Sequence, residues 1–235
     1  MATNLAGNGV CIGQYSVCLL RTASLDSTCT PETGVNTRLY STALVTMTAD
    51  PEKKEGKIYE STNGCGDRCF RVRKCDKTQG WNMSGEFCFM DAESAQLMFG
   101  GSLILGAAAT PFVGDVIGFA PLGADDACPD PVLLEIVTPL AVKGSGDCVA
   151  AGTAPTYRVH RFPKAKLTLG SLTFEDEVFK IPFTGFSEAN PNQGNPFADY
   201  PGVGVAPTGT GYFYYDIGAF PTLPVGAPRC GFFDS

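Results

Sequence analysis

Alternation of apolar and polar residues is the clearest pattern along the chain, and it predicts short β-strands. Residues 68–76 (RCFRVRKCD) place Phe70 and Val72 on one face and Arg71 and Arg73 on the other. Turns rich in Gly, Pro, Asp and Asn separate this segment from others that also have strand character. Those strands are predicted at residues 39–49, 57–61, 82–90, 101–109, 113–119, 132–142, 157–162, 167–174 and 178–186.

One segment has helical rather than strand periodicity. Asp91 is a helix N-cap residue by type, and the apolar residues of 92–99 recur three to four positions apart. Gly100 and Gly101 predict the end of the helix. Many short strands with a single helix are typical of a mainly β fold, and we expect a β-sandwich of two antiparallel sheets with one flanking α-helix.

Composition changes along the chain and suggests three parts. Residues 1–38 have weak periodicity and predict an extended N-terminal arm, whereas residues 39–190 carry the predicted sandwich domain. Residues 191–235 form a Gly/Pro/aromatic C-terminal extension that contains few charges. Because exposed aromatic surface favours association, we expect this extension to pack against another copy. Its candidate inter-subunit contacts are Tyr212, Phe213, Tyr214 and Tyr215.

The net charge of −7 argues against a protein that grips nucleic acid, since phosphate contacts need clustered Lys and Arg. Arg71 and Arg73 belong to the one cationic cluster, and we expect them to contact acidic residues of a neighbouring subunit. The first residues lack the pattern of a signal peptide. Residues 95–114 are uncharged, but glycines and a proline interrupt them, so no membrane span is expected.

No catalytic, cofactor or metal site is predicted. The single histidine, His160, lies within a predicted strand with no nucleophile motif nearby. Adjacent carboxylates occur at Asp125-Asp126 and at residues 175–177, where solvated loops are the simpler interpretation. The spacing of Cys65, Cys69 and Cys75 does not match a zinc site. An acidic, β-rich chain with terminal segments suited to association is typical of a self-assembling structural protein.

Three segments together resemble a known family. They are residues 157–163 (YRVHRFP), 166–176 (KLTLGSLTFED) and 181–191 (IPFTGFSEANP), preceded by Asn63-Gly-Cys-Gly66 and by the helix opened at Asp91. In order and spacing they resemble the major tail tube proteins of long-tailed, siphovirus-type bacteriophages, especially those of phages infecting actinobacteria. The resemblance covers roughly residues 40–195.

The resemblance implies a virion protein, assembled in the host cytoplasm, whose subunits form hexameric rings. Inner sheets of neighbours would join into a β-barrel, and stacked rings would form a tube around the tape-measure protein. Tail terminator and distal tail proteins would be further partners. Viral DNA would pass through the lumen without specific binding, because negative charge repels phosphate. Six copies at −7 each carry −42.

In that assembly we expect carboxylates on or beside strands to line the lumen, and one cysteine pair to oxidise outside the cell. The candidate lumen carboxylates are Glu60, Asp76, Glu86 and Glu135, and the candidate disulfide joins Cys65 and Cys69. Two alternatives remain open. One is a capsid decoration or minor tail protein, and the other is a carbohydrate-binding sandwich that uses residues 212–215 as a sugar platform.

Overall fold

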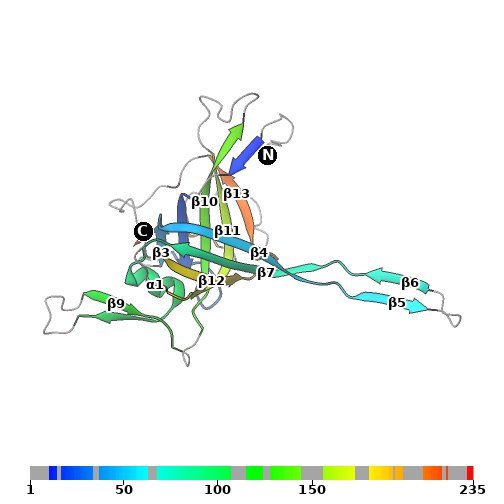
Figure 1. Cartoon of the computed structure of the whole chain (residues 1–235), viewed down its shortest axis with the longest axis horizontal. Helices are drawn as coiled ribbons and strands as arrows, with labels where there is room; N and C mark the ends of the chain where they lie inside the picture. The colour runs from blue at the N-terminus through cyan, green and yellow to red at the C-terminus, as the bar shows by residue number, and fades with distance from the viewer. Residues whose placement is uncertain are drawn as a thin grey trace.

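Antiparallel strands account for most of the regular structure in the computed structural model (Figure 1). The structure describes residues 11–14, 17–33, 37–62, 68–106, 115–123, 128–143, 156–172, 180–192, 194–197, 209–218, 221 and 232–234. The elements are β1 (Cys11–Gln14), β2 (Leu19–Ser24), β3 (Arg38–Ser41), β4 (Leu44–Lys54), β5 (Ile58–Thr62), β6 (Arg68–Arg73), β7 (Lys77–Phe87), α1 (Ala92–Phe99), β8 (Ser102–Leu105), β9 (Val116–Ala120), β10 (Val132–Lys143), β11 (Thr156–Leu169), β12 (Ile181–Ser187), β13 (Phe213–Ile217) and β14 (Phe232–Asp234).

Ten of the strands form one antiparallel sheet in the order β14-β3-β2-β10-β11-β12-β7-β4, to which β1 adds at β10 and β13 at β11. Strands β5 and β6 pair separately, as do β8 and β9. The prediction of a mainly β, antiparallel fold with one helix is therefore confirmed. The predicted division into two sheets is not seen, because β11 pairs with β10 along one edge and joins β12 along the other.

The long sheet bends over its own core. In Figure 1, β4, β7 and β12 run across β10 and β11 rather than alongside them. The main core accordingly unites residues from both parts of the sheet with the buried side of α1. Its members include Leu20, Leu39, Phe87, Met98, Phe99, Leu134, Phe162, Leu167 and Phe183.

A second, smaller core lies on the other face of the β2–β10–β11 region. Strand β10 shows why two cores exist: Leu134 and Ile136 belong to the main core, while Leu133 and Val137 belong to the second. Both faces of this strand are buried, which explains its nearly continuous apolar sequence. Phe197 and Ile217 from the C-terminal part of the chain complete the second core.

Helix α1 begins and ends where the sequence predicts. The Asp91 carboxylate accepts the Ser94 backbone N–H at 2.8 Å. Gly100 has a φ of 69° and donates its N–H to the Gln96 carbonyl at 2.9 Å, and Gly101 follows with a φ of 99°. Such backbone favours glycine, so both residues suit the helix end. The described part of the chain contains no helix long and apolar enough to cross a bilayer.

The predicted arm and extension are not separate from the domain. Strand β2, which lies within residues 1–38, pairs with both β10 and β3, and Leu19 and Leu20 are fully buried. Strands β13 and β14, within residues 191–235, pair with β11 and β3. These segments contribute strands and core residues to the sheet, so the prediction of a domain confined to residues 39–190 is wrong.

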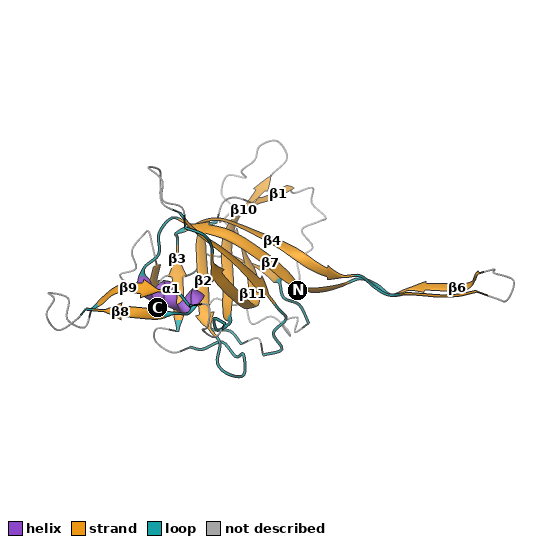
Figure 2. Cartoon of the chain, turned by 60° about the horizontal axis from the view of Figure 1, so that its bottom comes forward, coloured by secondary structure: helices purple, strands orange, loops and turns teal. Residues whose placement is uncertain are grey.

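Two hairpins extend from opposite ends of the body (Figures 1 and 2). The first continues the β4–β7 pair into β5–β6 and is the longest projection of the described chain. The second, β8–β9, follows α1 at the other end. An isolated two-stranded ribbon has little core of its own and is marginally stable in water.

Candidate assembly surfaces

A row of hydroxyl groups crosses four strands on the outer side of the bent sheet. Thr48, Ser84, Thr184 and Thr168 are consecutive cross-strand partners on β4, β7, β12 and β11, and all four are exposed. The Thr48 and Ser84 hydroxyls are 2.7 Å apart and hydrogen-bonded. We call this surface the polar face; it also includes Asp50, Asn82, Glu86 and Lys166.

The polar face carries few charges. Glu86, one of the predicted lumen carboxylates, lies there and pairs with Lys180 at 3.2 Å. Asp50 also lies there, opposite Asn82. Lys166 is the remaining cation among these residues. A face with so little clustered positive charge gives phosphates little to hold.

Strand β4 forms one end of the ten-stranded sheet. It is 11 residues long, and β7 is the strand with which it pairs in the described structure. A long edge strand offers unpaired backbone groups to a strand from another chain. Pro51 lies within it, at a position where the missing N–H is tolerated because the strand is an edge.

The long hairpin differs in charge from the rest of the chain. Residues 52–77, which we call the basic hairpin, contain eight of the 17 Lys and Arg residues and five of the 24 Asp and Glu residues. Their net charge is therefore +3, which leaves −10 on the remainder of a chain of net −7. Residues 51–60 and 71–79 are exposed apart from the half-buried Gly56.

One face of the basic hairpin carries ion pairs. The Arg71 guanidinium lies 3.8 Å from the carboxylate of Glu60, its cross-strand partner, and Arg73 lies 3.2 Å from Asp76. Asp76 also accepts the Gly56 backbone N–H at 2.8 Å, and this bond is the main reason that the Asp76 pKa is lowered. Arg71 and Arg73 thus have partners within their own hairpin, whereas sequence analysis expected partners on a neighbour.

The other face of the basic hairpin is apolar at its centre. Tyr59 and Val72 are cross-strand partners with 44% and 53% of their surface exposed. The Lys74 ammonium lies 5.3 Å from the centre of the Tyr59 ring, and Lys57 flanks the pair at the neighbouring position. Two exposed apolar side chains, with two lysines together at one end of them, form a small amphipathic patch, which we call the docking face.

Glu135 does not supply an exposed carboxylate, so its prediction as a lumen residue is wrong. Its side chain is fully buried between its cross-strand neighbours Arg21 and Arg161, each 1% exposed. The carboxylate lies 2.6 Å from Arg21 and 3.4 Å from Arg161. A buried charge requires such pairing and hydrogen bonding.

The C-terminal part of the chain covers this buried Arg–Glu–Arg cluster. The Tyr215 hydroxyl donates to Glu135 at 3.0 Å, and burial raises the pKa of Tyr215 strongly. The Phe197 ring lies 4.4 Å from the Arg21 guanidinium carbon, and Arg161 donates to the Gly194 carbonyl. The cluster therefore fastens residues 194–197 and β13 to the sheet.

The aromatic residues predicted as inter-subunit contacts mostly pack within their own chain. Tyr212 packs on Trp81 at 4.6 Å between ring centres and is hydrogen-bonded to the His160 ring at 2.8 Å. Phe213 is half-buried, whereas Tyr214 is 54% exposed with Arg158 lying over its ring. Four side chains in such different environments do not form a flat sugar platform.

His160 is held in a partly buried position between strands. Its Nδ1 is hydrogen-bonded to Tyr212, and its Nε2 lies 3.4 Å from the Thr138 hydroxyl. Burial, and secondly the positive charge of Arg158, lowers the His160 pKa, so the neutral form is favoured.

The candidate disulfide is outside what the structure describes. Cys65 lies in the undescribed residues 63–67, and for Cys69 the structure describes the backbone alone. None of the five cysteines with described side chains is in a disulfide; Cys75, Cys88 and Cys128 are exposed among them. No cluster of potential metal ligands occurs within the described residues.

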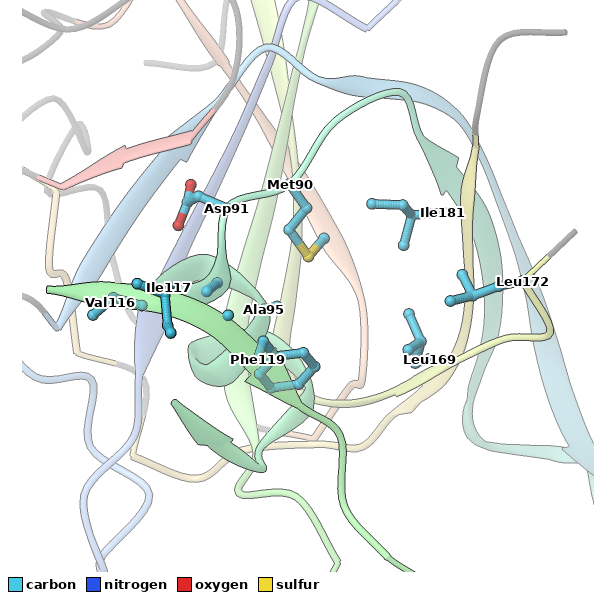
Figure 3. Close-up of a pocket in the computed structure, with 11 residues that line it drawn as sticks. Met90, Asp91, Ala95, Val116, Ile117, Phe119, Leu169, Leu172 and Ile181 are labelled. Atoms are coloured by element: carbon cyan, nitrogen blue, oxygen red, sulfur yellow. The ribbon is translucent and has the colours of Figure 1, made fainter. Parts of the chain in front are cut away.

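Two cavities flank helix α1. The first, the α1 groove, has a volume of about 450 Å³ and is lined mainly by apolar residues of α1, β9, β11 and β12 and of the segments next to them. Examples are Met90 before α1, Ile117 in β9 and Leu172 after β11 (Figure 3). Ile117 and Leu172 are 52% and 41% exposed. The second, the acidic pocket, has a volume of about 510 Å³ and is lined by three carboxylates and no cation: Glu32, Glu93 and Asp130.

Comparison with known proteins does not assign the chain to a family. No protein-family model matches it, and no curated protein sequence matches it significantly. The functional argument therefore rests on the residues and surfaces described above.

Proposed function

We propose that the chain is a structural subunit of a bacteriophage tail tube, in which stacked hexameric rings form the conduit for genome delivery. The observation that carries this proposal is the polar face next to a long open edge. Strand β4 offers backbone groups for pairing with a neighbouring subunit, and the same four-stranded region presents hydroxyl, amide and carboxylate groups.

The polar face has the chemistry that a DNA conduit needs. Continuing the sheet through β4 of each subunit would close a ring of strands and remove the open edges. Thr48, Ser84 and Thr184 would then face the channel, with Asp50 and Glu86 as its carboxylates. Because DNA affinity depends on clustered Lys and Arg, DNA would slide along such a wall without binding.

The remaining parts of the proposal come from the resemblance to tail tube proteins. The tube would surround a tape-measure protein and end at terminator and distal tail proteins, within the virion. The carbohydrate-binding alternative has less support, because residues 212–215 lack a common exposed face. A decoration protein would share the sandwich-like core but would not use β4 for ring closure.

Negative-stain electron microscopy of the purified protein, with mass photometry of the same sample, tests this function. We expect tubes, or rings with a central hole and six-fold symmetry. Ala49→Pro adds a second proline to β4 and should reduce ring formation. Ala49→Ser, which keeps the backbone N–H at the same position, is the matched control. A monomer of 24.8 kDa at every concentration would contradict the proposal.

A further inference from the structure

We propose that the docking face of the basic hairpin binds the α1 end of a second copy of this chain. Tyr59 and Val72 would enter the α1 groove, and Lys57 and Lys74 would face the carboxylates beside α1. The inference rests on the self-assembly part of the proposed function, but not on the passage of DNA.

Shape and polarity support this pairing. Tyr59 and Val72 are exposed on a projecting ribbon that has no core beneath them. The α1 groove is open and apolar, and Ile117 and Leu172 on its walls are likewise exposed. Figure 3 shows Met90 between the α1–β9 side of this groove and the Leu169, Leu172 and Ile181 side. Burying both apolar surfaces at once would remove them from water.

Charge complementarity selects a second copy as the partner. The basic hairpin carries +3 and the rest of the chain −10. The acidic pocket on the other side of α1 brings Glu32, Glu93 and Asp130 together, and Asp91 lines the α1 groove itself. Opposed potentials of this kind orient partners and accelerate their association.

Nucleic acid fits the hairpin less well. Glu60 lies opposite Arg71, and Asp76 lies beside Arg73, so carboxylates neutralise the arginines that phosphates would need. Lys57 and Lys74 lie together at one end of an exposed apolar pair, and such a patch suits a protein groove better than a phosphate backbone.

The geometry predicts a head-to-tail contact. The basic hairpin and α1 lie toward opposite ends of the long axis of the chain (Figure 1). Each copy can therefore use its hairpin on one neighbour and its α1 groove on another, which is a heterologous contact that propagates into rings or filaments.

Charge reversal with rescue tests the contact. We expect Lys57→Glu/Lys74→Glu, and separately Glu93→Lys/Asp130→Lys, to raise the protein concentration at half-assembly about tenfold or more, measured by light scattering. The rescue variant combines all four changes in one chain, so that every contact between two copies again joins opposite charges. It should assemble near the wild-type concentration. Lys166→Glu/Lys180→Glu changes the net charge by the same amount as Lys57→Glu/Lys74→Glu but lies away from the docking face, so it should assemble at a lower protein concentration than that double variant.

The outcomes separate this inference from the proposed function. Tubes that form equally well in all variants, or double variants that weaken assembly without rescue, overturn the head-to-tail contact and leave the tube proposal standing. Absence of self-association by the wild-type chain overturns both. Binding of double-stranded DNA that is lost in Lys57→Glu/Lys74→Glu, with assembly unchanged, would assign the hairpin to nucleic acid and overturn the inference.

A photo-crosslinker locates the contact directly. The chain with p-benzoylphenylalanine in place of Tyr59 should give a crosslinked dimer on irradiation, and mass spectrometry should place the crosslink within residues 90–119 or 169–181 of the second copy. The same group in place of Tyr214, which is 54% exposed elsewhere, is the control. A crosslink from position 59 to any other region contradicts the proposal that Tyr59 binds in the α1 groove.

Discussion

Replacing Glu135 with glutamine should destabilise the chain severely. The change removes the negative charge that lies 2.6 Å from Arg21 and 3.4 Å from Arg161, and both arginines are only 1% exposed. Loss of one partner from a buried ion pair costs about 3–5 kcal/mol, because the remaining charges stay buried without compensation. That cost is a large part of the 5–15 kcal/mol by which a typical domain is stable.

Guanidinium unfolding of the unassembled chain, followed by circular dichroism, measures the effect. The midpoint should fall while the slope of free energy against denaturant stays unchanged. A loss of 3–5 kcal/mol corresponds to a melting temperature lower by about 6–20 °C for a chain of this size. Glu86→Gln is the matched control, because its ion pair with Lys180 is exposed and should contribute less than about 1 kcal/mol.

Two results would refute this reasoning. The first is a change below about 1 kcal/mol for Glu135→Gln, since an uncompensated buried charge costs more than that. The second concerns the triple variant Arg21→Met/Glu135→Leu/Arg161→Met. This variant should recover most of the stability, because an apolar replacement leaves no buried charge. A triple variant as unstable as Glu135→Gln would show that lost packing, not charge, is responsible.

Four further predictions follow from other parts of the structure. Phe197→Ala should lower the free energy of unfolding by about 3–5 kcal/mol in denaturant, because it opens a cavity over Arg21. A loss as small as that of an exposed residue would mean that residues 194–197 do not cover the second core. Asp91→Ala should lower the free energy of unfolding by about 1 kcal/mol in the same assay, because α1 loses its N-cap, whereas Asp91→Asn should keep most of the N-cap stabilisation. Folding lowers the His160 pKa, so the unfolded state binds more protons and the free energy of unfolding should fall as the pH drops below about 6.5. His160→Gln should reduce this dependence of stability on pH, and an unchanged dependence would show that His160 is not its source. Thr184→Lys should leave particles assembled but impair DNA ejection, whereas Ser102→Lys should not, and equal ejection by both would place Thr184 outside the conduit.

The sequence predicted the strand content and the helix ends well, because both depend on local pattern. Asp91 and Gly100 act through bonds to residues three or four positions away, so their roles can be read locally. The alternating Thr, Ser and Asn residues of the polar face also gave a local signal. Which strands carry them side by side depends on sheet order, which alternation does not encode.

The buried cluster illustrates what local pattern leaves out. Arg21 and Glu135 each stand alone as a charge in a stretch without other charges, so the sequence carried a signal for these two, whereas Arg161 lies among Arg158, His160 and Lys164. Their meeting depends on the register of β2 with β10 and of β10 with β11. Sequence analysis placed Arg21 in an arm and Glu135 on a lumen, because it had no means to pair strands more than 100 residues apart.

Cryo-electron microscopy of tubes assembled from the purified chain tests the central claim most directly. The account predicts that the channel wall is formed by β4, β7, β12 and β11, with Thr48, Ser84 and Thr184 facing the lumen and β4 paired to a neighbouring subunit. A tube whose polar face points outward, or whose β4 edge has no partner strand, would contradict it.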